Sequence, residues 1–332
     1  MSVPLRSLIE RVPEDTIERV DKARLRWNQP VREVLRQETG LRLNRPDAGR
    51  ALGAQQTLQE AVGVPVRVEP GLPEALRSVE LDDVIALRVV LGRWRGTLEA
   101  LQKSASSVQR LVTELAGEGH AQRLVQGREI HLRHAEELAG GLLRELDQAD
   151  PLAKILEVNA DVLGVYTYDL PRQAALLGAD VPTGVRIELY WAVIGLVAEL
   201  LGRSVESLTV VVLSHELAHA YTHLACDIDG HRWASRAFAQ SEHVLVEGLA
   251  QYYTARVCER LQETFPDALE TYGLLLVKQP KAYRTHVQWV KDSRPEEIRF
   301  AMIEMRRRGI GRLAEFEGAL ADLRERLREG AP

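Results

Sequence analysis

The sequence predicts an α+β fold that is mainly helical, and three observations lead to this prediction. Apolar residues recur at helical spacing over most of the chain, including the long stretches 81–115 and 120–146. Strict alternation of apolar and polar residues, which is typical of strands, is confined to short segments such as 186–190. With 332 residues, 45% of them hydrophobic, the chain is long enough to bury a sizeable core.

The composition limits the classes of function. The net charge of −5 provides no overall basic field, so no nucleic-acid partner is expected. No apolar run approaches the roughly 20 residues that a membrane span requires, and Glu10, Glu14 and Asp15 follow the N-terminus too closely for a signal peptide. Cys226 and Cys258 are too few for a disulfide framework. We therefore expect a cytoplasmic protein without a membrane partner, and the oligomeric state stays open.

The first predicted domain, 1–80, is a helical segment with a short strand. Apolar spacing predicts two separate helices over 16–26 and 31–38, and a strand over 64–68. The breakers that separate these elements are Pro13, Pro30, Gly40 and Pro46. We expect this domain to pack onto the rest of the chain, because it carries no visible chemistry.

The second predicted domain, 81–150, is a long antiparallel helical hairpin. Its two amphipathic stretches are joined by Gly117-Glu118-Gly119, which predicts a tight turn between two helices. His120, His131 and His134 lie here without the spacing of metal ligands, so we expect them to be exposed. The hairpin is either a scaffold for the following domain or an arm that contacts a partner.

The third predicted domain, 151–332, begins at Asp150-Pro151 and combines a small sheet with helices. Strands are predicted over 162–168 and 186–190. Gly202 is expected to end a helix, and Ser204 to cap the next one. Later helices are predicted over 242–260, 266–276, 296–308 and 313–328. We expect the helices after residue 262 to close the far wall of a cleft.

A His-Glu-x-x-His motif, His215-Glu216-Leu217-Ala218-His219, lies on the helix that Ser204 caps. Residues four apart on a helix project from one face, so His215 and His219 can bind a single Zn²⁺. Glu216 lies about 100° round the helix, where it can act on a water beside the metal. Apolar residues share the face of the two histidines, so we expect both to point into the buried side of the helix. Buried histidines without a metal are the alternative, although leaving both unpaired would cost stability.

The motif is followed by Glu247-Gly248-Leu249-Ala250-Gln251-Tyr252, and together the two segments resemble the zincin metallopeptidases of the gluzincin type over residues 160–260. The resemblance implies a zincin-like catalytic core and a Zn²⁺ cofactor held by His215, His219 and Glu247. It implies that Glu216 is the general base towards water and then the proton donor to the leaving amine. It also implies that strand 186–190 pairs with an extended peptide substrate; a plain edge strand is the alternative.

Glu247 is the predicted third ligand, and other ligands stay open. It shares a helix face with Gly248, and a glycine inside a helix costs about 1 kcal/mol relative to alanine. We therefore expect a close approach of this helix to the metal-binding helix. Ala225 stands where metzincins have a third histidine, which excludes that class. The gap from His219 to Glu247 is longer than in compact gluzincins. If Glu247 is instead a solvated surface carboxylate, the third ligand is Asp227, Asp229, His231 or His243, or no Glu, Asp or His at all.

Two further expectations concern the surroundings of the site. His223 lies one turn beyond His219 and is expected to cap the helix or contact solvent. A zinc peptidase also requires a hydrogen-bond donor to the oxyanion that forms on the attacked carbonyl. The candidates for this donor are Tyr252, Tyr253, Tyr283 and His286, and the sequence does not choose between them.

The function expected from these residues is zinc-dependent hydrolysis of peptide bonds in a peptide or protein substrate. Two alternatives stay open. The first is a regulatory or binding protein whose zincin site is structural or weakly active. The second is a zinc hydrolase of non-peptide amides.

Overall fold

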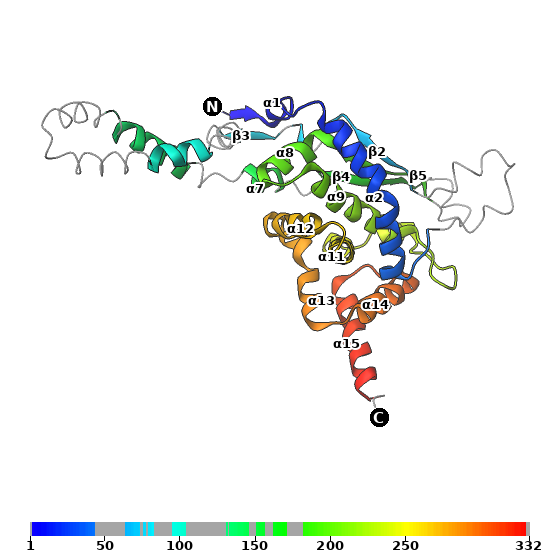
Figure 1. Cartoon of the computed structure of the whole chain (residues 1–332). Helices are drawn as coiled ribbons and strands as arrows, with labels where there is room; N and C mark the ends of the chain where they lie inside the picture. Colours follow the sequence, from blue (N-terminus) through cyan, green and yellow to red (C-terminus); the bar gives the residue numbers. More distant parts are fainter. Residues whose placement is uncertain are drawn as a thin grey trace, which may run out of the picture. The chain divides into compact units, whose positions relative to one another are not determined.

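A computed structural model of the chain divides into two compact units. The smaller unit is Met1–Arg11 with Leu76–Ile155, and the larger unit is Val12–Ala75 with Leu156–Pro332. The described residues are 2–43, 64–73, 76–77, 79–82, 95–103, 131, 133–145, 151–156, 162–170 and 182–329. They form a mainly helical α+β fold with small sheets, as predicted (Figure 1). The division into 1–80, 81–150 and 151–332 stays a prediction.

The smaller unit contains a two-stranded sheet and helical segments. β1 (Ser2–Pro4) pairs antiparallel with β3 (Glu80–Asp82), and α1 (Leu5–Ile9) follows β1 directly. Residues 95–103 and 133–145 are helical, and the Gln102 side chain lies 3.4 Å from the position of a Cβ built on Gly140. The turn of the predicted hairpin and His120 lie outside the described residues. His131 and His134 are exposed, as predicted.

α2 (Thr16–Thr39) is one continuous helix in the larger unit, so the predicted break at Pro30 is wrong. A proline inside a helix removes one hydrogen bond and costs about 3 kcal/mol. Trp27 and Val31 on either side of Pro30 are buried, and burying each such side chain contributes about 1.5–3 kcal/mol. Packing therefore outweighs the local cost. Gly40 ends the helix in the left-handed conformation, as predicted.

The larger unit has a three-stranded mixed sheet in the order β2-β5-β4. β2 (Val66–Glu69) lies parallel to β5 (Thr183–Tyr190), and β4 (Gly164–Asp169) lies antiparallel to it. The three predicted strands are therefore present. Residues 186–190, however, belong to the central strand. The expected pairing with a peptide and the alternative of an edge strand are both wrong, because β2 and β4 already bond to both sides of β5.

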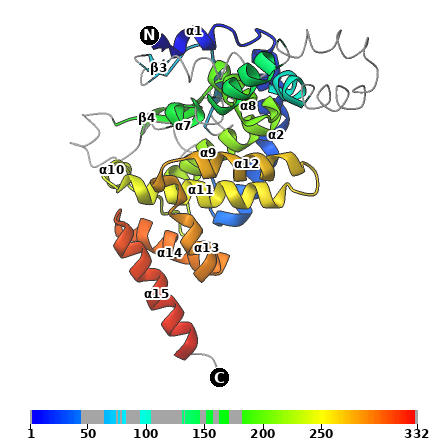
Figure 2. The same cartoon turned by 90° about the vertical axis from the view of Figure 1, so that its left-hand side faces the viewer.

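α9 (Val205–Leu224) lies in the middle of the larger unit (Figures 1 and 2). α8 (Trp191–Leu201) precedes it and ends at Gly202, and the Ser204 hydroxyl accepts a hydrogen bond from the Ser207 backbone N–H, as predicted. Every residue over 207–223 is buried. α9 is thus buried on all sides, rather than on one amphipathic face, because α2, α8, α11, α12 and the sheet all contact it.

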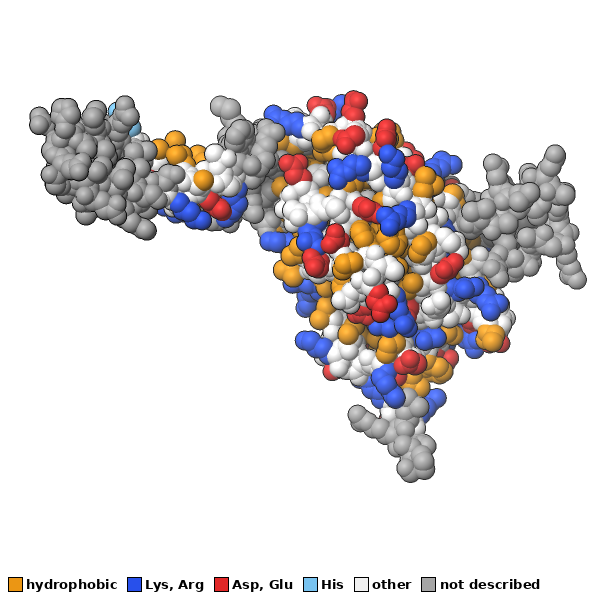
Figure 3. Space-filling view, viewed as in Figure 1, with side chains coloured by type: hydrophobic (Ala, Val, Ile, Leu, Met, Phe, Trp, Pro, Cys, Tyr) orange, Lys and Arg blue, Asp and Glu red, His pale blue; other side chains and the backbone are white. Residues whose placement is uncertain are grey.

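The C-terminal part of the larger unit is helical, as predicted. Its helices are α10 (Ser235–Ala239), α11 (His243–Arg260), α12 (Pro266–Lys278), η4 (Lys281–Arg284), α13 (His286–Asp292), α14 (Pro295–Arg308) and α15 (Leu313–Glu329). No helix within the described residues is long and apolar enough to cross a membrane. On the face shown in Figure 3, basic and acidic side chains are interspersed, so that face of the larger unit presents no field of a single sign.

Gly248 packs against α13, not against α9, so the predicted partner of this glycine is wrong. A Cβ built on Gly248 would lie 2.6 Å from the Trp289 ring. The ring of Trp289 is buried, and its atoms cannot retreat as the end of a flexible side chain would. The predicted packing of α11 on α9 is present, but the close contact at Gly248 is made by Trp289 of α13.

We expect Gly248→Ala to lower the free energy of unfolding by up to about 2 kcal/mol, because overpacking against Trp289 costs about 1–3 kcal/mol and the gain in helix propensity offsets only about 1 kcal/mol. Chemical denaturation monitored by circular dichroism measures this change. Gly273→Ala is the matched control: Gly273 also lies inside a helix, and nothing lies within 4 Å of a Cβ built on it. The control should be stabilising by up to about 1 kcal/mol. Equal stabilisation by both substitutions would contradict the packing account.

Candidate metal centre

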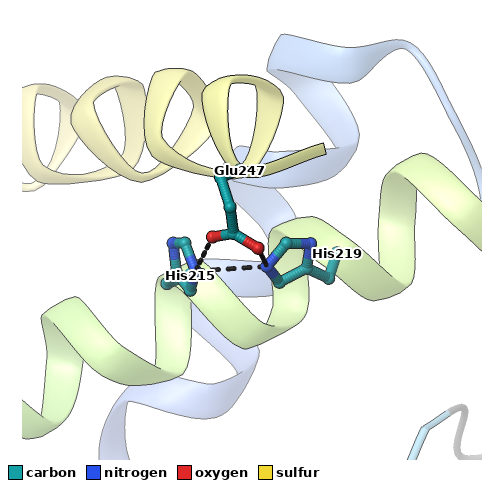
Figure 4. A group of neighbouring side chains, drawn as sticks. All are labelled: His215, His219 and Glu247. Carbon is teal, nitrogen blue, oxygen red and sulfur yellow. Dashed lines mark hydrogen bonds and ion pairs between the residues drawn. The ribbon is translucent and has the colours of Figure 1, made fainter. Parts of the chain in front are cut away.

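Three buried side chains converge between α9 and α11 (Figure 4). His215 and His219 project from adjacent turns of α9, and their Nε2 atoms are 3.1 Å apart. Glu247 approaches from α11, with Oε2 3.2 Å from His215 Nε2 and Oε1 3.5 Å from His219 Nε2. The structure thus brings together all three residues that the sequence predicts as ligands.

Two helices hold these side chains. α9 and α11 pack directly on each other, and Glu247 is only 3% exposed even though it lies in the second turn of α11. The two imidazole rings stand nearly perpendicular, at 87°, with their centroids 4.7 Å apart. Because the helix spacing places the histidines side by side, the facing helix needs to supply only one further group.

The distances within this cluster fit a tetrahedral metal ion. Zinc binds nitrogen and oxygen ligands at about 2.0–2.2 Å, so two neighbouring corners of its tetrahedron are about 3.3–3.6 Å apart. The two Nε2 atoms are 3.1 Å apart, and each lies 3.2 or 3.5 Å from a different oxygen of Glu247. One ligand atom from each of the three residues lies within 4.8 Å of the other two. Two imidazoles and one carboxylate are also the ligand set of open zinc sites. The residues present therefore fit a metal ion of the zinc type.

The charge of Glu247 depends on the two histidines. Burial alone would raise the pKa of this carboxyl group, but the charges and hydrogen bonds of His219 and His215 outweigh burial and hold the pKa well below its usual range. An ionised carboxylate in a buried position requires positive charge beside it. A cation bound by His215, His219 and Glu247 would supply that charge.

A partly open pocket of about 480 Å³ lies beside the cluster. His215 and Glu216 from α9 both line it, and so does Tyr283 from η4. Leu275 of α12 also lines the pocket, whereas no residue of α14 or α15 does. The prediction that the C-terminal helices line the cleft is therefore confirmed for α12 and wrong for α14 and α15, and η4, which was not predicted, also lines the pocket.

Gly164 at the start of β4 permits a close approach of the strand to Glu216. A Cβ built on Gly164 would lie 2.8 Å from Val212 Cγ1 and 3.1 Å from Glu216 Cγ. Any larger residue would displace one of these side chains, so the glycine allows the backbone of β4 to form part of the pocket wall. Sequence reasoning missed this role, although a glycine at the start of a predicted strand is a signal for it.

The alternative ligands lie elsewhere. Asp227 accepts hydrogen bonds from the backbone N–H groups of Asp229 and His231, and both aspartates pair with Arg307. His243 comes nearest, with Nε2 3.6 Å from Glu247 Oε1. Among the described residues, only His215, His219 and Glu247 form a group that can hold a metal ion.

His223 is part of the core, so the expectation that it caps α9 or contacts solvent is wrong. Its Nδ1 lies 2.9 Å from the Tyr166 hydroxyl, and its ring stacks on Phe238 at 4.3 Å. Burial, with a smaller contribution from nearby positive charge, lowers the pKa of His223 to about 3. The imidazole is therefore neutral and serves packing.

Of the four candidate oxyanion donors, the structure brings only Tyr283 to the pocket. The Tyr283 ring lies 5.9 Å from the His215 ring. His286 instead lies 2.8 Å from the Tyr272 hydroxyl, and burial lowers its pKa to about 4. Tyr252 and Tyr253 are buried in α11 and do not line the pocket.

No protein-family model matches the chain, and comparison with curated proteins and with solved structures gave no significant match. The features of this chain that bear on function are the cluster of His215, His219 and Glu247, the neighbouring Glu216, and the pocket beside them.

Proposed function

We propose that this protein is a zinc-dependent metallopeptidase whose site resembles that of the zincins. The observation that carries the proposal is the set of 3.1–3.5 Å separations among His215, His219 and Glu247. Glu216 adds to it, because this carboxyl group lines the same pocket as His215. One ion held by the three ligands would thus adjoin both a base and a space for substrate.

In this proposal, His215, His219 and Glu247 would hold the ion, beside the pocket that His215 lines. Zinc, when bound there, lowers the pKa of water and polarises the substrate carbonyl. Glu216 accepts the proton of the attacking water and then donates it to the leaving amine. Glu216 is 2% exposed, and this burial limits competing exchange of the proton with bulk water.

The outer edge of β4 is the proposed position for an extended peptide backbone. Among the described residues, β4 pairs only with β5, so the far side of the strand offers backbone groups to a ligand. Its first residue, Gly164, lines the pocket close to Glu216. In this arrangement β4 takes the role of pairing with an extended peptide substrate, which the resemblance assigns to 186–190. The arrangement therefore favours a peptide or protein substrate.

Tyr283 is the proposed donor to the oxyanion, and we expect Tyr283→Phe to lower kcat by about 10²–10³-fold. The hydroxyl would act mainly in the transition state, so KM and zinc content should change little. Steady-state kinetics with a cleaved peptide measures the effect. Tyr253→Phe is the control, because the buried Tyr253 hydroxyl makes no hydrogen bond within the described structure. A similar, small effect of both substitutions would remove Tyr283 from the mechanism.

Hydrolysis of a peptide library tests the proposed function. The zinc-loaded protein should cleave library members, a chelator should abolish cleavage, and added zinc should restore it; mass spectrometry of the products measures each step. A parallel set of small amides separates the alternatives. Cleavage of small amides alone would move the function to a non-peptide hydrolase, and cleavage of neither set would favour a regulatory or binding protein.

A further inference from the structure

Outside His215 and Glu216, the pocket beside the metal cluster is lined by uncharged residues. Apart from His215, Glu216 and Tyr283, its described lining is aliphatic except for two side-chain amides, Gln251 and Gln279. The space within it is about 480 Å³ including open solvent, so the pocket suits one side chain of a substrate better than a folded segment.

Gln251 belongs to the same face of α11 as the ligand Glu247, one turn further along the helix. Its Nε2 donates a hydrogen bond to Gln279 Oε1 at 3.1 Å. Its Oε1 is buried and accepts no hydrogen bond within the described structure. A buried amide oxygen without a donor is unfavourable, so a ligand in the pocket whose N–H meets this oxygen after a rotation of the Gln251 amide gains affinity.

We propose that this pocket binds the carboxamide side chain of a glutamine or asparagine residue next to the hydrolysed bond, and that Gln251 selects it. The inference rests on the proposed function, because His215 and Glu216 line the same pocket. A carboxamide can donate an N–H to Gln251 Oε1 and offers a carbonyl oxygen as acceptor, so it is complementary to an amide wall.

Other side chains fit this pocket less well. An aliphatic side chain fills the apolar volume but leaves Gln251 Oε1 without a donor. A carboxylate lacks the N–H, and it brings a negative charge into the pocket that Glu216 lines. A basic side chain would pair with Glu216 and so compete with its proposed role as the base. The uncharged amide is the class that avoids all three conflicts.

Ligand-observed NMR titration of the zinc-loaded full chain tests this inference. The probes are the N-acetyl amides of glutamine, methionine and glutamate, which differ only in the side chain. We expect the glutamine probe to bind about tenfold more tightly than the methionine probe, and the glutamate probe to bind most weakly. In Gln251→Met, the preference for glutamine over methionine should disappear. Gln288→Met, a change of the same type at an exposed position of α13, should retain it.

Equal affinity of the unsubstituted protein for the glutamine and methionine probes would overturn the inference, whether or not any variant folds. Tighter binding of the glutamate probe that persists in the metal-free protein would also overturn it, because Gln251 would then present its N–H. A glutamine preference that survives in a folded Gln251→Met variant would remove Gln251 as the selecting residue. The titration requires no turnover, so a preference without peptide hydrolysis would refute only the proposed function, and hydrolysis without the preference would refute only this inference.

Discussion

Glu216→Gln should lower kcat by about 10²–10⁴-fold while leaving zinc content and fold unchanged. An amide has almost the shape of the carboxyl group but cannot accept the proton of the attacking water. Glu216 lines the pocket without belonging to the ligand cluster, so the metal should remain. Peptide hydrolysis, zinc analysis and circular dichroism on the same preparation measure the three quantities.

Glu199→Gln provides the control for this substitution, because Glu199 is exposed on α8 and lies outside the pocket. The control should hydrolyse at the unsubstituted rate. Hydrolysis by Glu216→Gln at that same rate would exclude Glu216 as the base. Loss of zinc together with activity would instead make Glu216 part of the metal site.

Glu247→Ala should lower zinc affinity by orders of magnitude, because it leaves two imidazoles as the only protein ligands. Helix packing should maintain the fold, since α11 also buries Leu245, Leu249 and Tyr253. Glu247→Asp should have an intermediate zinc affinity, because its shorter side chain moves the carboxylate away from the metal. Metal–ligand distances tolerate deviations of only about 0.2 Å. Competition with a chromophoric chelator measures the affinity, and circular dichroism monitors folding.

His215→Ala and His219→Ala should lose zinc in the same assay, whereas Glu259→Ala, near the other end of α11, should retain it. Glu259 is partly exposed and pairs with Arg256, away from the cluster. Unchanged affinity in Glu247→Ala would contradict the ligand assignment. If His243→Ala then lost affinity, the third ligand would move to His243, whose ring nitrogen lies closest to Glu247 among the alternatives.

Features that depend on local chemistry could be predicted from the sequence. Ser204 caps α9 because its hydroxyl accepts a hydrogen bond from a backbone N–H only three residues away. Gly202 ends α8 because a glycine readily adopts the left-handed conformation at the end of a helix. Both effects involve only neighbouring residues, so the sequence predicts them. The relation of His215 to His219 follows from one helical turn in the same way. The residue pattern also singled out Glu247, and the structure places it opposite this pair.

Features that depend on distant partners could not be predicted. The alternation over 186–190 predicts a strand, but its central place requires β2, which comes from residues more than a hundred positions earlier. The glycine at position 248 predicts a close contact of its helix, but the sequence does not indicate that Trp289 makes this contact. His223 has the same helical spacing as the ligand histidines, and only the packing of Tyr166 and Phe238 shows that it belongs to the core.

The central claim is that His215, His219 and Glu247 hold one zinc ion, and anomalous diffraction at the zinc edge tests it most directly. A crystal of the zinc-loaded protein should show one strong anomalous peak about 2.0–2.2 Å from Nε2 of both histidines and from one carboxylate oxygen of Glu247. A peak bound by other residues, or no peak at the cluster in the presence of zinc, would contradict the assignment of this site.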